Sequence, residues 1–223
     1  VYEQLFAGDL TRSVRNGGKH AFIADGYLPQ DAIRGELAES WQMKDDPLRV
    51  EIQLRKGVMF AEKPGVMKSR ELTAEDVVFS YNRLDQSAKK IPAYFDHIDK
   101  VQATGKHSVV FSFKNYNAEW DYRFGWGYYS AIVPKEVAEK GAGDWKNING
   151  TGPYFLKNYV QGNGYTFEKN PNYWDSETIG GQSYKLPFVD KIHYRVIGDE
   201  ATWLTALRTG KLDILEAVRW SSV

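Results

Sequence analysis

The amino-acid sequence predicts a fold of the α/β or α+β class with mixed sheets, in which hairpins dominate. The first observation is the strict alternation of apolar and polar residues over 48–55, which is typical of a half-buried strand. The second is the helical spacing of apolar residues after Thr73. The third is a pair of glycine-containing turns, each between two short alternating segments. Strands and helices therefore mix along the chain.

The clearest strand covers residues 48–55, and Lys56-Gly57 turns the chain after it. The clearest helix covers 73 to about 84. Its first residue, Thr73, is placed to cap the first amides, and the carboxylates of Glu75 and Asp76 oppose the helix dipole.

Two hairpins are expected farther along. One joins 98–103 to 108–114 across a four-residue loop, and the other joins 154–160 to 165–169 across Gly162-Asn163-Gly164. The remaining expected elements are a helix begun by Pro134 and ended by Gly141, a strand over 191–197, and a helix capped by Asp199 that stops at Gly210.

The stretch from Gly141 to Gly152 holds four glycines and several polar residues, so it is the best domain boundary in the chain. Residues 1–6 already have the character of a structural element, and residues 212–218 form another apolar element with almost nothing after it. Both ends therefore look cut from a longer chain.

Composition excludes several classes of function. The 223 residues include 29 basic and 29 acidic side chains, so charge gives no argument for a nucleic acid or an anionic membrane as partner. Cysteine is absent, and the four histidines lie far apart in sequence, so we expect no metal site and no cofactor. The motifs of serine hydrolases and of phosphate-binding loops are missing as well. No catalytic residue is therefore expected.

Aromatic side chains are the more informative signal. They make up 14% of the chain, and one cluster, Trp126-Gly127-Tyr128-Tyr129, places rings beside a glycine that lets a ligand or a backbone approach closely. The alternative is that these rings pack in the core or between lobes. Tyr173-Trp174 forms a second such cluster, for which packing is the stronger reading.

Seven stretches, taken together and in order, resemble the family 5 extracytoplasmic solute-binding proteins, the receptors of ATP-driven importers for peptides, nickel and some oligosaccharides. The stretches are Leu37-Ala38-Glu39-Ser40-Trp41, residues 54–60, residues 71–80, Gly150-Thr151-Gly152-Pro153-Tyr154, Asn170-Pro171-Asn172-Tyr173-Trp174, residues 187–192 and residues 206–214.

This resemblance implies a fold like that of the type II periplasmic-binding proteins, with mixed sheets in two lobes, of which only the amino-terminal half is present. Residues 1–6 would be the first strand of domain I, 7–150 would be domain II, and 151–223 would be a partial domain I. The implied protein is a monomer in the periplasm or elsewhere outside the cytoplasm, free or lipid-anchored, that delivers its solute to ABC permease subunits.

The resemblance also indicates where the solute would bind. The segment before Ile132-Val133-Pro134 faces the interlobe cleft in the family, so we expect the ligand-binding residues Trp126, Tyr128, Tyr129 and Ser130, with Tyr94 nearby and Tyr27 in the long loop after the first strand. The expected solute is a peptide, and an oligosaccharide is the alternative. A carbohydrate-active enzyme and the sensory ectodomain of a signalling protein are the rival classes.

Overall fold

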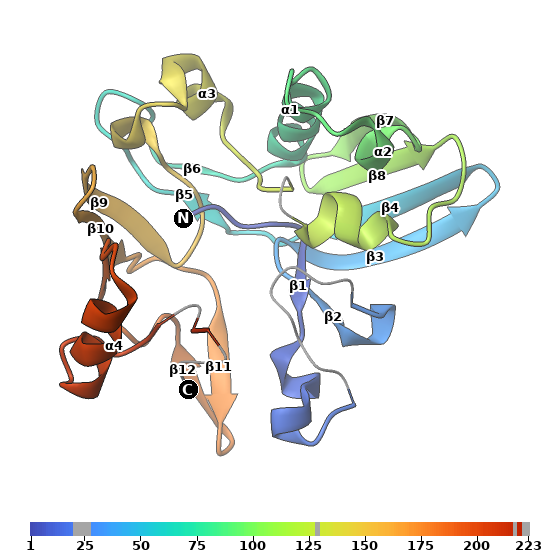
Figure 1. Cartoon of the computed structure of the whole chain (residues 1–223). Coiled ribbons are helices and arrows are strands. Elements are labelled where there is room, and N and C mark those ends of the chain that lie inside the picture. The colour runs from blue at the N-terminus through green and yellow to red at the C-terminus, as the bar shows by residue number, and fades with distance from the viewer. Residues whose placement is uncertain (20–27, 128–129, 216–217, 220–223) are drawn as a thin grey trace.

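The computed structural model describes residues 1–19, 28–127, 130–215 and 218–219, without the side chain of Arg15. Figure 1 shows two groups of elements, with the N-terminal segment between them. The mixture of helices with several small sheets agrees with the predicted fold class.

The largest sheet has four antiparallel strands in the order β3-β4-β8-β7. Their bounds are Ala38–Asp45 (β3), Leu48–Leu54 (β4), Ser108–Phe113 (β8) and Ile98–Gly105 (β7). The alternation in β4 has the expected effect, because Val50 and Ile52 are fully buried. The β7–β8 hairpin is confirmed, although Gly105 pairs with Ser108 and so leaves a loop of only two residues.

One face of this sheet is covered by the helix α1, Ala74–Asp85, which packs on β7 and β8. Thr73 is its N-cap, as predicted, and the Asp76 carboxylate accepts a hydrogen bond of 2.9 Å from the Thr73 amide. The helix α3, Lys135–Gly141, follows its N-cap Pro134 and packs against α1. The apolar core lies between these layers.

The second group contains the three-stranded sheet β13-β10-β9 and the hairpin β11–β12. The bounds are Tyr154–Val160 (β9), Gly164–Lys169 (β10), Ser176–Ile179 (β11), Gln182–Lys185 (β12), Lys191–Arg195 (β13) and Glu200–Arg208 for the helix α4. Asp199 caps α4 as predicted, because its carboxylate accepts from the Thr202 amide at 2.8 Å. The predicted strand over 191–197 ends two residues early.

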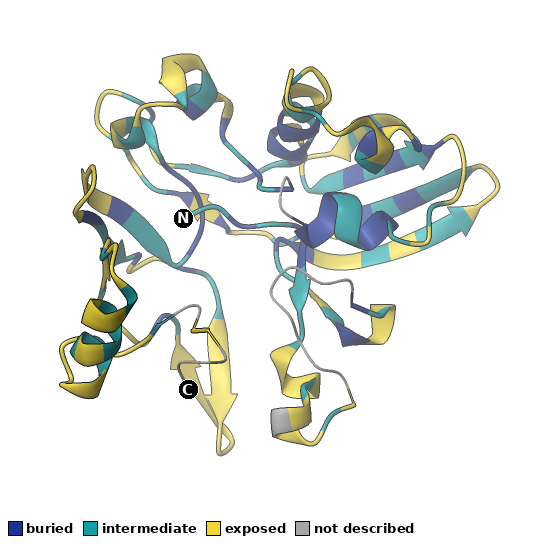
Figure 2. Cartoon of the chain, viewed as in Figure 1, coloured by how far each residue is buried: buried dark blue, intermediate teal, exposed yellow. Residues whose placement is uncertain are grey.

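Burial differs sharply between the two groups. Figure 2 shows dark buried residues concentrated in the large sheet and α1, whereas β11 and β12 are exposed throughout and α4 has no buried residue. The exposed large apolar side chains of the second group are Tyr159, Val160, Ile179, Tyr184, Phe188, Val189, Tyr194, Val196, Ile214 and Val218. The part of this group that is described therefore buries little apolar surface of its own.

Several small elements complete the described fold. They are β1 (Phe6–Gly8) paired with β2 (Ile33–Gly35), β5 (Met59–Phe60) paired with β6 (Arg70–Glu71), the short helix α2 (Pro92–Phe95), the 3-10 turns η1 (Leu10–Arg12), η2 (Val14–Asn16), η3 (Gln30–Ala32) and η5 (Trp145–Asn147), and the π-helix η4 (Tyr122–Trp126). The first strand begins at Phe6, whereas we expected it over 1–6; the division into domains at 6 and 150 stays a prediction.

The N-terminal segment is held closely by the glycines near residue 150. The Gly152 amide donates to the Val1 carbonyl at 2.8 Å, and a Cβ atom on Gly150 would lie only 2.4 Å from that oxygen. No side chain larger than hydrogen fits there without a shift. Within the described ranges no helix is long and apolar enough to cross a bilayer.

Candidate functional site

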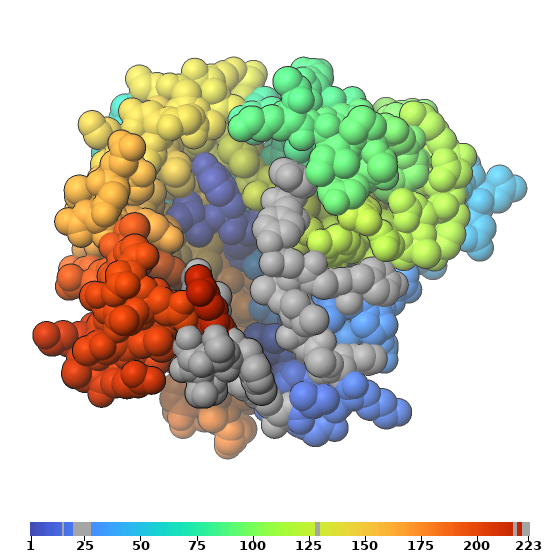
Figure 3. Space-filling view, in the orientation of Figure 1, coloured from blue at the N-terminus to red at the C-terminus, as the bar shows by residue number. Residues whose placement is uncertain are grey.

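The candidate site is a hollow on the face shown in Figure 3, with atoms of the N-terminal segment at its floor. The segment's two polar side chains, Glu3 and Gln4, make contacts to residues more than 120 positions away. These contacts fix the floor to both groups of elements.

Glu3 anchors the floor to the second group. Its side chain is 2% exposed, and Oε1 accepts hydrogen bonds from the Tyr173 hydroxyl at 3.1 Å and from Trp174 Nε1 at 2.9 Å. The Glu3 carbonyl also accepts from the Ile132 amide at 3.0 Å. Burial raises the pKa of the Glu3 carboxyl, although the neighbouring hydroxyl and indole donors oppose this shift.

Gln4 joins the same floor to the segment that follows η4. Its Nε2 donates to the Gly127 carbonyl at 2.7 Å and to Ser130 Oγ at 2.9 Å, and Ser130 Oγ in turn donates to the Gly127 carbonyl at 2.6 Å. The Gln4 backbone amide donates to Glu36 Oε2 at 2.8 Å. Gln4 therefore holds both the segment around Gly127 and Ser130 and the carboxylate of Glu36 in place.

Glu36 is half-buried at the end of β2, and burial followed by the charge of Glu3 raises its pKa to about 8. Two arginines lie close to this region, and the charge of Arg34 opposes the rise in the pKa of Glu36. Arg55 donates to the Glu36 carbonyl at 2.6 Å and lies over the Trp174 ring at 4.5 Å, and Arg34 pairs with Asp175 at 3.4 Å.

The predicted wall residue Trp126 ends η4 and is 9% exposed, packed edge-on against Tyr122 at 4.9 Å between ring centroids. Its indole Nε1 has no hydrogen-bond partner among the described residues. The expectation that glycines beside Trp126 let a ligand approach needs correction, because a Cβ on Gly127 would lie 2.6 Å from the Tyr122 carbonyl oxygen and one on Gly125 would lie 2.1 Å from the Phe6 ring. Gly125 thus gives room to Phe6 rather than to a ligand.

The other predicted site residues have different positions. Ser130 is buried, and its hydroxyl donates to the carbonyl of Gly127, the residue that follows Trp126. Tyr94 belongs to α2, which packs on η4, and the Arg123 guanidinium lies 4.0 Å from its ring centroid. Tyr27, Tyr128 and Tyr129 lie outside the described residues.

Sequence reasoning missed Glu3, Gln4 and Glu36. Glu3 was the detectable one, since it is an acidic residue within an otherwise apolar and polar-uncharged segment of residues 1–6. Glu3 matters to the site because of its contacts with residues 132, 173 and 174, and no pattern in the sequence around Glu3 predicts those contacts.

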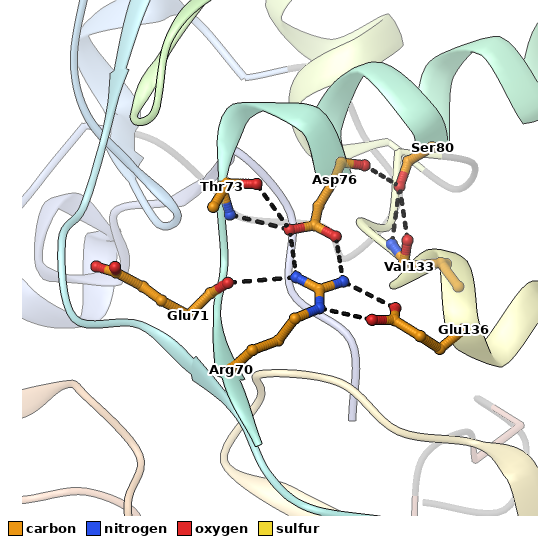
Figure 4. A network of polar contacts seen from close by, with 7 residues as sticks. All are labelled: Arg70, Glu71, Thr73, Asp76, Ser80, Val133 and Glu136. Atoms are coloured by element: carbon orange, nitrogen blue, oxygen red, sulfur yellow. Dashed lines mark hydrogen bonds and ion pairs between the residues drawn. The ribbon is translucent and has the colours of Figure 1, made fainter. Parts of the chain in front are cut away.

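A second polar cluster, drawn in Figure 4, is structural. Arg70 pairs with Asp76 through bonds of 2.7 and 2.9 Å and with Glu136 through bonds of 2.7 and 2.8 Å, so it joins β6 to α1 and α3. These groups border a groove of about 1080 Å³ with Val78 and Phe79 among its lining residues. The charges of Arg70, Asp76 and Glu136 are already paired with one another, so this cluster is a clamp that holds β6, α1 and α3 together. In the described part of the chain no three acidic or histidine side chains are grouped to hold a metal ion.

The arrangement of helices with several antiparallel sheets, and with the N-terminal segment between two groups of elements, is shared with solved solute-binding proteins. The structure of the ABC transporter-associated periplasmic binding protein DppA from Helicobacter pylori, in complex with the peptide STSA, matches with a TM-score of 0.69 over 95% of this chain and 40% of that chain, at 23% identity. The structure of MoaA from A. tumefaciens R10 with mannopinic acid has a TM-score of 0.68 over 85% of this chain and 36% of that one, at 26% identity.

The sequence comparisons give the family. The model of the bacterial extracellular solute-binding proteins, family 5 (Middle), matches residues 32–223, so the chain belongs to this family. The probable D,D-dipeptide-binding periplasmic protein DdpA of Escherichia coli is 27% identical, over 88% of this chain and 36% of its own length. The oligopeptide-binding protein AppA of Bacillus subtilis is 26% identical, over 81% of this chain and 32% of its own length. The chain thus spans about a third of these relatives.

Proposed function

We propose that this chain is the amino-terminal part of the solute-binding receptor of an ABC importer, and that the receptor captures a peptide in the hollow above Glu3 and Gln4. The observation that carries the proposal is the family match over residues 32–223. The receptor would act outside the cytoplasm as a monomer, deliver its solute to the permease subunits by closing around it, and do no chemistry.

The choice of a peptide is supported by relatives that are named for peptides in Escherichia coli and Bacillus subtilis. A small sugar-related solute or an oligosaccharide is the second candidate. It is favoured by the likeness to MoaA, which was solved with mannopinic acid, and by the aromatic content of the chain.

Trp126 and Ser130 would form the wall of the site, together with Tyr94, Tyr27, Tyr128 and Tyr129. Trp126 has the strongest support, because its indole N–H is buried without a partner in the described structure. An unpaired buried donor costs free energy, and a carbonyl or carboxylate oxygen of the solute would satisfy it.

The exposed apolar side chains of the second group support the proposal that further chain covers them in the receptor. A solute that touches one wall only cannot select a closed state, so we expect this chain alone to bind weakly or not at all.

The test is native mass spectrometry of the receptor, expressed from its complete coding sequence, with a tripeptide library and with maltose-series and raffinose-type oligosaccharides in parallel. We expect retention of tripeptides. Retention of oligosaccharides alone would establish the second candidate, and cleavage of an oligosaccharide would refute a receptor without chemistry. Calorimetry of this chain with a retained tripeptide should give no measurable heat; an affinity equal to that of the receptor would show that one wall suffices.

A further inference from the structure

Three asparagine–glycine pairs occur in the chain, Asn16-Gly17, Asn149-Gly150 and Asn163-Gly164. Because glycine has no Cβ atom, its backbone nitrogen can approach the side-chain carbonyl carbon of the preceding asparagine with little steric hindrance. The three pairs therefore share the same local chemistry. The structure distinguishes them by how firmly each asparagine is held.

Asn163 lies at the tip of the hairpin that joins β9 to β10, and it is exposed like the rest of the turn over 161–163. Its backbone amide donates to the Val160 carbonyl at 3.0 Å, and its backbone carbonyl accepts from the Val196 amide at 2.8 Å. Its side-chain amide makes no hydrogen bond with the residues that the structure describes. Exposed loop tips are weakly constrained, so this side chain can rotate towards the Gly164 nitrogen.

Asn149 is held most firmly of the three. It is 2% exposed, and its Nδ2 donates to the Ala61 carbonyl at 2.8 Å. The backbone that follows is closely packed as well, because a Cβ on Gly150 would lie 2.4 Å from the Val1 carbonyl oxygen. Rotation of the Asn149 side chain requires local opening of the structure, so the fold protects this pair.

Asn16 is intermediate between the other two. It is exposed, but its Nδ2 donates to the Leu10 carbonyl at 2.9 Å. The Gly17 amide, which would have to react, donates to the Val14 carbonyl at 3.2 Å. The side-chain bond must break before the side chain can rotate, and a hydrogen bond of this kind slows such a step roughly two- to tenfold.

We infer that Asn163 is a modification site, at which the side-chain amide is lost by cyclisation onto the following residue. The Gly164 nitrogen attacks Asn163 Cγ, so that an N–Cγ bond forms and the Cγ–Nδ2 bond breaks. Nδ2 leaves as ammonia and carries away the proton of the Gly164 amide. Water, the only co-reactant, then opens the cyclic imide at either carbonyl and yields aspartate or isoaspartate. The inference is independent of the proposed receptor function.

The product changes the end of the β9–β10 hairpin. Both products carry a new negative charge at residue 163. In the isoaspartyl form the main chain runs through the former side chain and gains a carbon atom, and the carbonyl that accepts from the Val196 amide becomes a free carboxylate. Val196 follows β13 directly, so the modification alters the contact between the turn and this edge strand.

The experiment uses the receptor expressed from its complete coding sequence, as wild type and as Asn163→Gln. Glutamine keeps the amide, but the same attack would have to close a larger ring. Both proteins are incubated at mildly alkaline pH, folded and in urea, and are then digested at acidic pH, where cyclisation is slow. Mass spectrometry follows the conversion of amide to acid in the peptide of each pair, with synthetic aspartyl and isoaspartyl peptides as standards. Released ammonia is measured in parallel.

In the folded wild type we expect product at Asn163, formed roughly two- to tenfold faster than at Asn16, and no product at Asn149 over the same time. In urea the three rates should converge, because the contacts that distinguish the pairs are lost. Asn163→Gln should give no product in its own peptide and should release less ammonia.

Absence of product at Asn163 in the folded receptor would overturn the inference. So would faster conversion at Asn16 or Asn149 than at Asn163. The same ranking and spread of rates in urea would also overturn it, because the structure would then have no part in selecting the site.

Discussion

Replacing Arg70 by methionine tests whether the Arg70 cluster is a clamp that holds α1 and α3 together. The guanidinium forms bidentate pairs with both Asp76 and Glu136, and it also donates to the Glu71 carbonyl at 3.2 Å. Methionine keeps most of the apolar stem over the Phe60 ring, where the guanidinium now lies 4.9 Å from the centroid. The substitution therefore removes the charge and the hydrogen bonds with little loss of packing.

The expected cost follows from how far each partner is exposed. The Asp76 side chain is 5% exposed, so losing Arg70 leaves a nearly buried carboxylate that keeps only its bonds to Thr73. Removing one partner of a buried ion pair costs about 3–5 kcal/mol. The Glu136 side chain is 33% exposed and can be solvated, so its part adds no more than about 1 kcal/mol. Because Arg70 is itself 32% exposed, we take the lower end, about 3 kcal/mol in all.

Urea unfolding of the chain at pH 7 measures this loss, and a thermal melt should show a decrease of roughly 6–12 °C for a chain of this length. Arg49→Met is the matched control. It breaks the Arg49–Glu51 pair of 2.8 Å on the exposed side of the large sheet, where an ion pair contributes less than about 1 kcal/mol.

The role of Arg70 as a clamp would be refuted if Arg70→Met lowered the free energy of unfolding no more than Arg49→Met does. A second variant, Glu136→Gln, keeps a neutral acceptor for Arg70 and leaves Asp76 paired, so it should cost about 1 kcal/mol. Equal losses in Arg70→Met and Glu136→Gln would mean that the contact to α3, rather than the buried Asp76, carries the energy.

Three further predictions concern stability. The pKa of Glu36 is about 8 in the folded state against 4.5 in the unfolded state, so between these pH values the folded state binds the proton more tightly. The free energy of unfolding should therefore fall as pH rises from 4.5 to 8, by at most about 1.4 kcal/mol per pH unit. Urea unfolding at several pH values should show a shallower fall in Glu36→Gln, and identical slopes would contradict the assigned shift. Gly125→Ala forces a methyl against Phe6 and should cost about 1–3 kcal/mol, whereas Gly143→Ala, with open space around it, should be nearly neutral; equal melting temperatures would rule out the close contact. Thr73→Ala should cost about 1 kcal/mol through loss of the cap. Thr73→Asp should cost more than Thr73→Ser, because the Thr73 hydroxyl lies 3.3 Å from a carboxylate oxygen of Asp76 and a second carboxylate there would be repelled. The reverse order in urea unfolding would argue against that placement.

Local elements of the fold were predictable because local interactions determine them. The strand at 48–54 follows from alternation, α1 from its N-cap and spacing, and the β9–β10 hairpin from two glycines that adopt positive φ, Gly162 at 74° and Gly164 at 155°. Each signal spans only a few residues, so no knowledge of distant contacts was needed.

The site was predictable only in part, since its contacts join distant residues. The sequence indicates rings near Gly125, but it cannot show that Phe6, 119 positions earlier, fills the space beside that glycine. Likewise, Glu36 resembles any surface acid in the sequence, and it becomes distinctive only where the Gln4 amide and the Glu3 carboxylate meet it. The expected roles of Tyr27, Tyr128 and Tyr129 stay predictions.

The contacts of Glu3 impose an order on the steps by which the chain can fold while it is being synthesised. The Glu3–Tyr173 bond spans 170 residues, so at about 5–20 residues per second the ribosome needs roughly 10–30 s after making Glu3 before its partner exists. The large sheet and α1 lie wholly within residues 38–113 and can assemble during that time. The side chain of Glu3 must wait for Tyr173 and Trp174, whereas Phe6 contacts Trp41 and Trp120, which are made much earlier. During synthesis, the contacts that join the N-terminal segment to the second group of elements are thus expected to form after the large sheet has assembled.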